Sequence, residues 1–476
     1  MPFKLFCRST IPALWMALST GGLAQQAPID PPSAAPADAP NPAPPLSPRR
    51  GSTSEATASQ EIASQGFAVH GQATFMEQVT APFHAPYRGP NSLSSGQGAE
   101  TFDATLFLGA RLWSGAEAWI NPEIDQGYGL DGTLGVAGFP SGTAYKVGRS
   151  HPYWRLPRLV VRQTIDLAGD RQPLEAIANQ LAGSQSANRW VFTVGKFGVP
   201  DIFDANQYAH DPRNDFLNWA AIEAGSFDYA ADAWGYTVGA AAEWYQGAWA
   251  LRAGVFDLSN VPNSETLDPG FHEYQWVGEL EKRHELMGMP GKLLVTLFDS
   301  RGRMALLSDA VSLAQATGEN IGATLVDVRR YRNRTGVSLN LQQQLSSDLG
   351  MFARAGKAGG NVEAYEFTDI DRTISAGLSL QGKRWSRADD TVGLAAILNG
   401  ISATRERFLN AGGLGILVGD GQLPHPGSEQ ILETYYRLAV VQWAQLTLDY
   451  QYVINPAYNT DRGPVSIFAV RLHAQF

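Results

Sequence analysis

The end of the chain, residues 466–476, alternates between two kinds of side chain. The apolar parity ends on an aromatic residue and consists of Phe468, Val470, Leu472, Ala474 and Phe476. The other parity becomes polar towards the end, with Arg471, His473 and Gln475. Because a β-strand places alternate side chains on opposite faces, this segment has one hydrocarbon face and one face suited to water. The same alternation recurs along the chain, which favours a transmembrane β-barrel over a large soluble all-β protein.

Sixteen segments show such strand-like patterns, and bacterial outer-membrane barrels have an even number of strands. The predicted strands are 66–80, 101–113, 115–126, 158–168, 189–201, 233–245, 248–259, 272–285, 291–303, 334–346, 349–359, 374–387, 390–402, 429–441, 444–455 and 466–476. We therefore predict an all-β fold, a transmembrane antiparallel β-barrel of about 16 strands.

The connections between these segments alternate in length. If the first strand runs outward, every second connection is periplasmic, and these positions hold short joints such as 114–115, 246–247 and 388–389. The opposite connections are longer, among them 81–100, 127–157, 202–232, 304–333 and 403–428. Short periplasmic turns and long outer loops are typical of such barrels. One periplasmic connection, 169–188, is long, and its stretch 174–181 predicts a short helix.

The segment 233–245 has the length of a membrane-crossing strand. Trp234 and Tyr236 at one end share a face with Trp244 at the other. About ten residues with a rise of ~3.3 Å, tilted by roughly 45°, cover about 23 Å. This length matches an apolar band of about 25 Å between two aromatic girdles, so we expect all three aromatic residues to face lipid.

The N-terminal region carries the signals of an exported protein. A basic start, a short apolar run and a small-x-small pattern at 22–24 predict a signal peptide at 1–24. Residues 25–60 are rich in Pro and Ala and predict a disordered arm, which leaves 61–476 for the barrel. The single cysteine, Cys7, lies inside the signal, so the mature chain would contain no disulfide. The net charge of −10 gives no support to nucleic-acid binding.

Three stretches of the sequence resemble a known family. They are Gly195-Lys196-Phe197 followed by Asp201-Ile202-Phe203-Asp204, the run from His210 to Trp219 continued by Tyr229 to Gly235, and the ending from Asn455 to Phe476. Together they are similar to the OprB family of carbohydrate-selective porins, and the resemblance covers about 66–476. It implies a Gram-negative outer-membrane channel for passive diffusion of glucose-like sugars, without a cofactor. The oligomeric state, monomer or homotrimer, and the physiological sugar stay open.

One predicted strand supplies a polar wall for the lumen. The inner face of 115–126 carries Glu117, Trp119, Asn121 and Glu123. Charged and amide groups bind hydroxyls, and an aromatic ring suits the apolar face of a sugar. Trp119 could instead fill space beneath a loop. Arg111, on the inner parity of the neighbouring strand, is expected to pair with Glu117 across the tight turn.

The segment 202–232 is predicted to narrow the channel. It occupies an outer-loop position but is rich in large aromatic residues, so we expect it to fold into the lumen and pack on the wall. By resemblance it is the constriction loop. Its candidates for contact with sugar hydroxyls are Asp211, Arg213, Asn214 and Asp215, which could instead only pin the loop to the wall. Arginines of inner parity predict a basic ladder: Arg162, Arg252, Arg354, Arg437 and Arg471.

Other functions find little support in the sequence. The eight histidines form no H-E-x-x-H pair and no G-x-S-x-G elbow is present, so we expect neither a metal site nor an enzyme. Asp204 and Asn206 faintly resemble the start of a calcium loop, but Ala209 stands where such a loop needs glycine. An outer-membrane enzyme or adhesin is the alternative of another class. Within the channel class, the alternative is a general, non-selective porin for small hydrophilic solutes.

Overall fold

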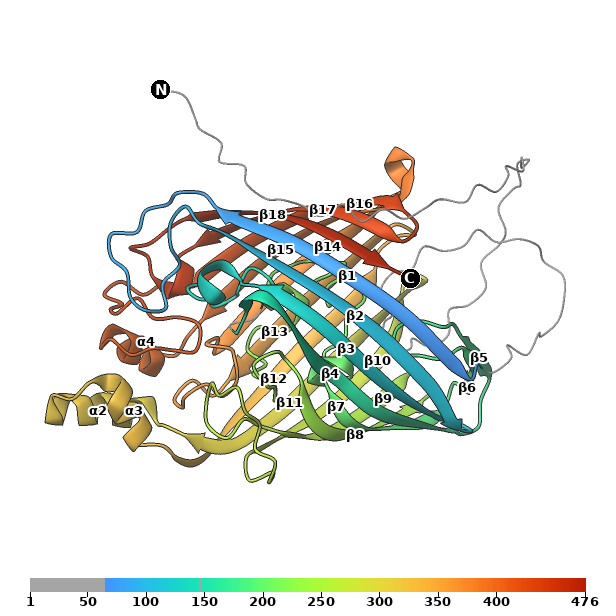
Figure 1. The fold of residues 1–476 in the computed structure, drawn as a ribbon, viewed down its shortest axis with the longest axis horizontal. Helices are drawn as coiled ribbons and strands as arrows, with labels where there is room; N and C mark the ends of the chain where they lie inside the picture. The colour runs from blue at the N-terminus through green and yellow to red at the C-terminus, as the bar shows by residue number, and fades with distance from the viewer. Residues whose placement is uncertain (1–64, 145–146) are drawn as a thin grey trace. The chain divides into compact units, whose positions relative to one another are not determined.

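The computed structural model describes residues 65–144 and 147–476. Sixteen strands of this part close into one antiparallel barrel, in which the first strand pairs with the last (Figure 1). The predicted fold class is therefore confirmed. The predicted signal peptide at 1–24 and the arm at 25–60 lie outside the described residues and stay predictions.

The bounds of the elements follow the chain. The barrel strands are β1 (Phe67–Thr80), β2 (Gly98–Trp113), β3 (Ala116–Gly127), β4 (Arg149–Asp166), β7 (Arg189–Phe197), β8 (Thr237–Gln246), β9 (Trp249–Asp257), β10 (Tyr274–Leu286), β11 (Met289–Met304), β12 (Arg330–Gln344), β13 (Leu349–Ala358), β14 (Arg372–Gly382), β15 (Arg387–Gly400), β16 (Glu429–Val441), β17 (Ala444–Ile454) and β18 (Val465–Gln475). A separate hairpin consists of β5 (Arg171–Leu174) and β6 (Gly183–Ser186). The α-helices are α1 (Trp219–Ile222), α2 (Leu307–Thr317), α3 (Ile321–Asp327) and α4 (Ala403–Asn410).

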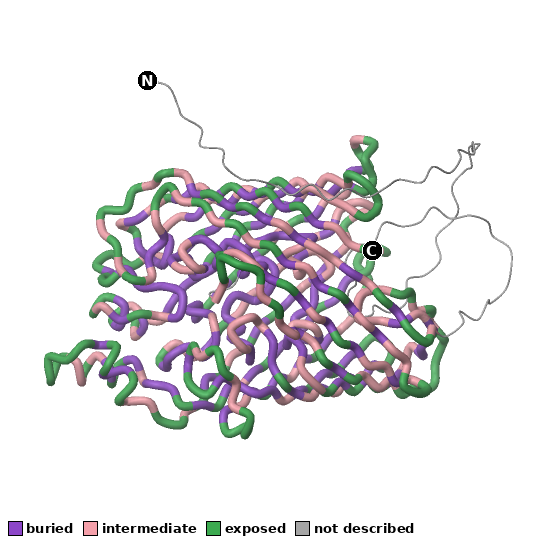
Figure 2. Tube along the Cα trace, in the orientation of Figure 1, coloured by how far each residue is buried: buried purple, intermediate pink, exposed green. Residues whose placement is uncertain are grey.

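The alternation in the sequence becomes an alternation of exposure along each strand (Figure 2). On β18, Phe468 and Leu472 are about half exposed, whereas Arg471 and His473 are buried inside the barrel. On β2, Phe102 and Leu106 face outward in the same way. The outward face is the one that meets lipid in a transmembrane barrel. No helix of the described part of the chain is long and apolar enough to cross a membrane.

All sixteen predicted strands are present, but the start of one was placed too late. β4 begins at Arg149 and not at residue 158. The segment 149–157 contains Pro152 and Pro157, and proline argues against a strand in a sequence-based prediction. The ladder between β3 and β4 accommodates these residues with register shifts between Asn121 and Glu123 and again near Gly127. A proline inside a barrel strand is tolerated where the ladder is interrupted in this way.

Three smaller predictions were wrong. The stretch 174–181 is the end and tip of the β5–β6 hairpin, not a helix. β8 starts only at Thr237, so Trp234 and Tyr236 precede it, and Tyr236 is buried instead of facing lipid. The turn expected at 388–389 lies earlier, between β14 and β15, because β15 already begins at Arg387.

The connections show the expected asymmetry. The long connections gather at one end of the barrel, with α2, α3 and α4, and the β5–β6 hairpin lies at the other end with the short turns (Figure 1). In the tight turn between β2 and β3, Gly115 has a φ of 74°, which a residue with a side chain adopts only with strain. Since long loops face outward in such barrels, the first end is the extracellular one.

Candidate functional site

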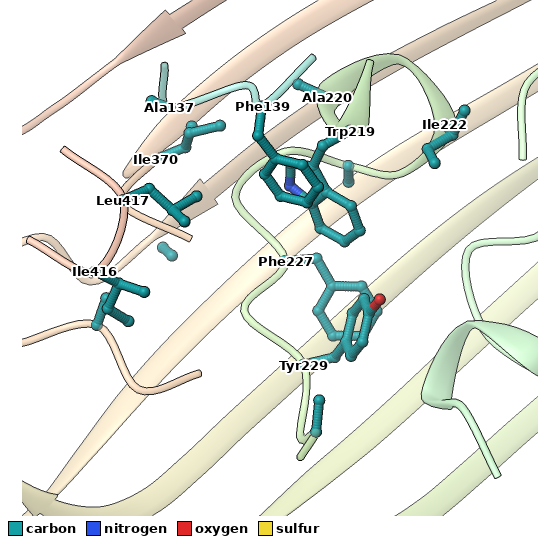
Figure 3. Packing of buried hydrophobic residues seen from close by; sticks show 14 of the residues in the cluster. Ala137, Phe139, Trp219, Ala220, Ile222, Phe227, Tyr229, Ile370, Ile416 and Leu417 are labelled. Carbon is teal, nitrogen blue, oxygen red and sulfur yellow. The ribbon is translucent and has the colours of Figure 1, made fainter. Parts of the chain in front are cut away.

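Two outer loops fold into the barrel and occupy the extracellular half of its interior. The first is 198–236, between β7 and β8, and its Phe203, Phe216 and Phe227 are fully buried. The second is the segment 128–144, which follows β3, and its Phe139 stacks on Trp219 of the first loop with ring centroids 5.3 Å apart (Figure 3). The loop 198–236 therefore folds into the barrel, as predicted for the constriction loop at 202–232.

The inward fold of the segment 128–144 was not predicted. Its Val136 and Ala137 are fully buried, and Glu429 of β16 accepts hydrogen bonds from the backbone N–H groups of Ala137 and Gly138, at 2.9 and 2.8 Å. The apolar residues at 134–139 were a sequence signal for burial. The many glycines of the loop, however, are typical of an ordinary exposed loop. A carboxylate that accepts two backbone N–H groups holds the loop where glycine allows close approach.

Arg354 of β13 anchors the constriction loop from the opposite wall. Its side chain is fully buried and lies 3.2 Å from the carboxylate of Asp204. It also donates hydrogen bonds to the carbonyl oxygens of Ala221, at 2.7 Å, and Ala209, at 2.9 Å. Asn340 donates to Asp204 as well, at 2.7 Å. The residues that resembled a calcium loop therefore bind an arginine and an amide.

The predicted residues 211–215 form a tight turn within this loop. Asp211 accepts hydrogen bonds from the backbone N–H of Arg213, at 2.9 Å, and from the amide of Asn214, at 2.7 Å. Asp215 accepts the backbone N–H of Asp211 at 3.1 Å. Arg471 of β18 donates to the carbonyl of Asp215 at 3.0 Å. These contacts fix the turn to itself and to the barrel wall.

Arg437 of β16 adds a further anchor, because it donates to the carbonyl of Asn214 at 3.3 Å. The predicted basic ladder is therefore not a row of free charges. Arg252, the remaining buried member, pairs with Glu279 at 2.8 Å and with Glu281 at 2.9 Å. These arginines lie on the inner face, as their parity predicted, and they hold loops or neighbouring carboxylates.

Arg213 crosses from the loop to the wall of β2 and β3. Its guanidinium donates to Asp103 from two nitrogens, at 3.0 and 2.9 Å, and lies 3.9 Å from Glu123. Glu123 also pairs with Arg155 of β4, which the sequence analysis did not single out, and accepts the hydroxyl of Thr105 at 2.5 Å. Arg213 thus pins the loop and at the same time lines the channel cavity.

The channel cavity has a volume of about 400 Å³ and is lined by both inward loops, by β4, by the hairpin tip 177–180 and by the loops 359–371 and 411–428. Its charged lining residues are Arg158, Arg162, Asp201, His210, Asp211, Arg213, Asp215, Glu223, Asp232 and Glu366. Its aromatic lining residues include Phe107, Phe139, Phe197, Trp219, Tyr229, Trp234, Tyr236 and Phe367. A larger apolar hollow of about 790 Å³, beside Trp154, Trp443 and Phe476, is lined mainly by outward residues and belongs to the lipid-facing surface. The channel cavity therefore combines charged groups with aromatic rings.

The periplasmic connection 167–188 narrows the channel cavity at its periplasmic end. The tip of its hairpin, 177–180, contributes to the cavity lining. Arg162 of β4 donates to the carbonyl of Asn179 at 2.8 Å, and Glu117 accepts the backbone N–H of Leu181 at 3.1 Å. The channel is thus narrowed from both ends. Sequence reasoning missed this contribution because it placed a helix in the connection.

Two of the predicted residues hold this periplasmic tip. Arg111 and Glu117 are directly opposite in register, but they form no ion pair with each other in the described part of the chain. Glu117 instead pairs with Arg162 at 3.0 Å. Arg111 donates to the carbonyl oxygens of Gln65 and Ala182, at 3.0 and 3.2 Å. The expected pair between Arg111 and Glu117 was therefore wrong.

The other predicted residues of β3 are less accessible. Trp119 is 1% exposed and its ring lies over Gly109, where a Cβ would come within 2.4 Å of it. Asn121 is fully buried. Neither residue belongs to the lining of the channel cavity. The space-filling alternative for Trp119 fits this position, whereas Trp219 of the constriction loop, which the sequence did not single out as a site residue, lines the cavity.

Trp219 has a feature suited to ligand contact. It is 3% exposed, and its indole N–H has no hydrogen-bond partner within the described residues. A buried N–H without a partner costs free energy, which a ligand hydroxyl or a water molecule in the cavity can offset. Its ring also contacts Tyr229 and Phe367, with centroids 5.5 and 4.8 Å away.

His210 and Glu223 form a buried ion pair inside the constriction loop, with Nδ1 and Oε1 3.2 Å apart. Burial alone would lower the pKa of His210, but the adjacent Glu223 carboxylate overrides this effect and raises the pKa to about 9. Burial also raises the pKa of Glu223, to about 7, against the attraction of His210. The loop therefore holds a charged pair above neutral pH.

This pair predicts a loosening of the loop at alkaline pH. The pKa of His210 in the docked loop lies above its ordinary value of 6.5, so the pair is charged at slightly alkaline pH and its stabilising contribution is lost as the pH rises through about 9. We expect the channel conductance to rise between about pH 8 and pH 10. In Glu223→Gln, the rise should move to lower pH. An unchanged conductance profile in this variant would show that the pair does not control docking.

Comparisons with known proteins agree with this architecture. A model of the family described as carbohydrate-selective porin, OprB family, matches residues 91–476. The chain is similar to the high-pH structure of Pseudomonas putida OprB, with a TM-score of 0.65 at 16% identity over 86% of this chain and 94% of that one. It also matches the outer membrane channel DcaP of Acinetobacter baumannii, at 9% identity over 86% of this chain and 97% of that one, with a TM-score of 0.49. No curated protein sequence matches. Since the family match covers most of its length, the chain belongs to the OprB family of carbohydrate-selective porins.

Proposed function

We propose that the channel cavity admits neutral, glucose-sized carbohydrates, and that Trp219 and the turn 211–215 make the contacts that distinguish them from other solutes. The protein itself is an outer-membrane porin, by its family and its sixteen-stranded barrel. The observation that carries the proposal is the cavity of about 400 Å³, in which aromatic rings face ionised groups. A sugar presents an apolar ring face to the first and hydroxyls to the second.

The chemistry of transport follows from the pairing of the charges. Asp201 is held by Arg158 at 2.7 Å, and Asp103 is held by Arg213 at 3.0 Å. Paired charges retain lone pairs and N–H groups for a hydroxyl, but they bind a lone ion less strongly than an isolated charge would. Contacts of this kind are numerous and individually weak, which lets the solute leave again. We propose passive diffusion with no covalent step.

Solute uptake by proteoliposomes tests the proposal. Liposomes containing the purified protein should swell faster in glucose than in a zwitterionic amino acid of similar size, because the cavity offers its hydroxyl partners as neutralised pairs. The matched control is the same protein at high salt, which screens exposed charges and leaves buried pairs largely intact. Equal swelling rates for the two solutes would make the protein a general, non-selective porin.

Arg213→Ala should weaken sugar binding and widen the channel. The substitution removes the guanidinium that lies between the loop and Asp103, and a hydrogen bond from a charged group contributes about 1.5–3 kcal/mol. The expected loss of glucose affinity is about tenfold, since ~1.4 kcal/mol corresponds to that factor. Glucose titration of the channel current measures it. Arg213→Lys, which keeps the charge without the planar fork, should be intermediate, and unchanged affinity in both variants would remove Arg213 from the site.

A further inference from the structure

A group of basic side chains lies on the outward face of the barrel, close to its extracellular end. Arg301 and Arg303 belong to β11, Lys357 belongs to β13 and Arg372 belongs to β14. All four side chains are exposed. On β11, the two arginines share the outward parity of Leu297, which is 58% exposed on the lipid-facing surface. We call these four residues the basic rim.

Neighbouring aromatic residues mark the depth of the basic rim in the membrane. In the register of the sheet, Tyr274 lies directly opposite Arg301, and Tyr331 lies directly opposite Arg303. Trp276, 53% exposed, follows two residues further towards the apolar band. Trp and Tyr concentrate at the level of the lipid headgroups. Arg301 and Arg303 therefore lie at the headgroup layer of the outer leaflet, and Lys357 and Arg372 lie at the extracellular ends of β13 and β14.

The charges of the basic rim are neutralised only in part, by the attraction between Arg303 and the carboxylate of Glu273. Within residues 65–144 and 147–476, none of its four side chains forms an ion pair or donates a hydrogen bond. Arg301 lies over the ring of Tyr331, 5.7 Å from its centroid, which orients the guanidinium without cancelling its charge. The nearby carboxylate of Asp299 accepts a hydrogen bond from Asn333 at 2.6 Å.

The second half of the basic rim carries an internal repulsion. Lys357 and Arg372 are directly opposite each other on adjacent strands. Like charges in this arrangement destabilise a sheet unless an anion lies between or above them.

A further carboxylate lies near Arg303, that of Glu273, and it accepts a hydrogen bond from the hydroxyl of Tyr331. The face therefore keeps an excess of positive charge at headgroup depth.

We propose that the basic rim binds the phosphate groups of an anionic lipid of the outer leaflet. The planar guanidinium fork of arginine matches phosphate oxygens with two parallel hydrogen bonds, and lysine adds a point charge that reaches the headgroup layer from an apolar stem. Four basic residues near a membrane surface attract anionic lipid additively. The lipid would anchor the extracellular ends of β11 to β14, which loop 305–329 and loop 359–371 connect.

Native mass spectrometry of the full protein in detergent tests the proposal, with lipid A carrying two phosphates as the probe. The bound fraction of wild-type protein should exceed that of R301Q/R303Q about tenfold, and K357Q/R372Q should lie between them. Fully dephosphorylated lipid A should bind as weakly to wild type as to R301Q/R303Q. Heat-modifiable migration in gel electrophoresis confirms that each variant forms a closed barrel.

The matched control is Lys282→Gln at the periplasmic end of β10. Lys282 also lies over an aromatic ring, 4.2 Å from the centroid of Trp249, but at the opposite rim. This variant should bind the probe as well as wild type does. Equal binding of lipid A to wild type and R301Q/R303Q would overturn the proposal, as would an equal loss in Lys282→Gln or equal binding of the dephosphorylated lipid.

Discussion

Arg354→Ala should release the constriction loop and abolish most of the sugar selectivity. Arg354 is the buried partner of Asp204 and of two loop carbonyl groups, so its removal leaves a carboxylate buried without its cation. Breaking a buried ion pair in this way costs about 3–5 kcal/mol. We expect a several-fold rise in conductance and similar permeation of glucose and amino acids, measured on single channels and in proteoliposomes.

A double variant separates the loss of docking from general misfolding. In Arg354→Met with Asp204→Asn, the uncompensated charge is absent, so docking should be weakened less than in Arg354→Ala. Both proteins should still form heat-modifiable barrels, because the strand ladders of β13 are unchanged by either substitution. A closed, folded Arg354→Ala channel with wild-type conductance would contradict the proposed role of this anchor.

Removing the periplasmic tip should raise the flux without removing the selectivity. Residues 168–187 can be replaced by Asn-Gly, because Leu167 and Asn188 already face each other across the hairpin, joined by a backbone hydrogen bond of 2.9 Å. The replacement opens the lower end of the channel cavity and leaves the constriction loop in place. We expect higher conductance with the preference for glucose over amino acids retained.

Glu117→Gln is the milder companion of this deletion. It removes the charge that pairs with Arg162 but keeps an oxygen for the N–H of Leu181, so the tip should loosen only partly. Its conductance should lie between that of wild type and the deletion. If the deletion channel conducts like wild type, the tip does not narrow the path of the solute. The preference for glucose over amino acids in the deletion channel then shows whether the constriction loop alone narrows the path.

The strands could be predicted from the sequence because the membrane imposes a physical alternation on each of them. On β18, Phe468 and Leu472 meet lipid while Arg471 and His473 meet the interior, and the sequence shows this alternation of apolar and polar residues at the end of the strand. Turns that depend on one residue, such as Gly115, were predictable for the same local reason. The predicted start of β4 was too late because this strand contains two prolines. They are tolerated at register shifts of the ladder, and these shifts depend on the partner strand β3, which a local pattern does not show.

The site was less predictable because it is made of contacts between distant segments. The aromatic content of 202–232 indicated an inward loop, and Asp211, Arg213 and Asp215 of this loop line the channel cavity. The partners could not be predicted: Arg213 meets Asp103 across 110 positions of the chain, and Arg354 meets Asp204 across 150. The hairpin tip carries no local signal of its inward position, and the apolar residues at 134–139 are too few among glycines to indicate one, since the opposite wall and the strand ends fix both segments.

Single-channel recording with increasing glucose tests the central claim, that the channel cavity between the constriction loop and the periplasmic tip is the path of the sugar. We predict brief, concentration-dependent interruptions of the current, which become rarer and shorter in Trp219→Leu and disappear in Arg354→Ala. Interruptions that are equally frequent in all three proteins, or a current that glucose reduces only as it changes the viscosity of the bulk solution, would contradict the account.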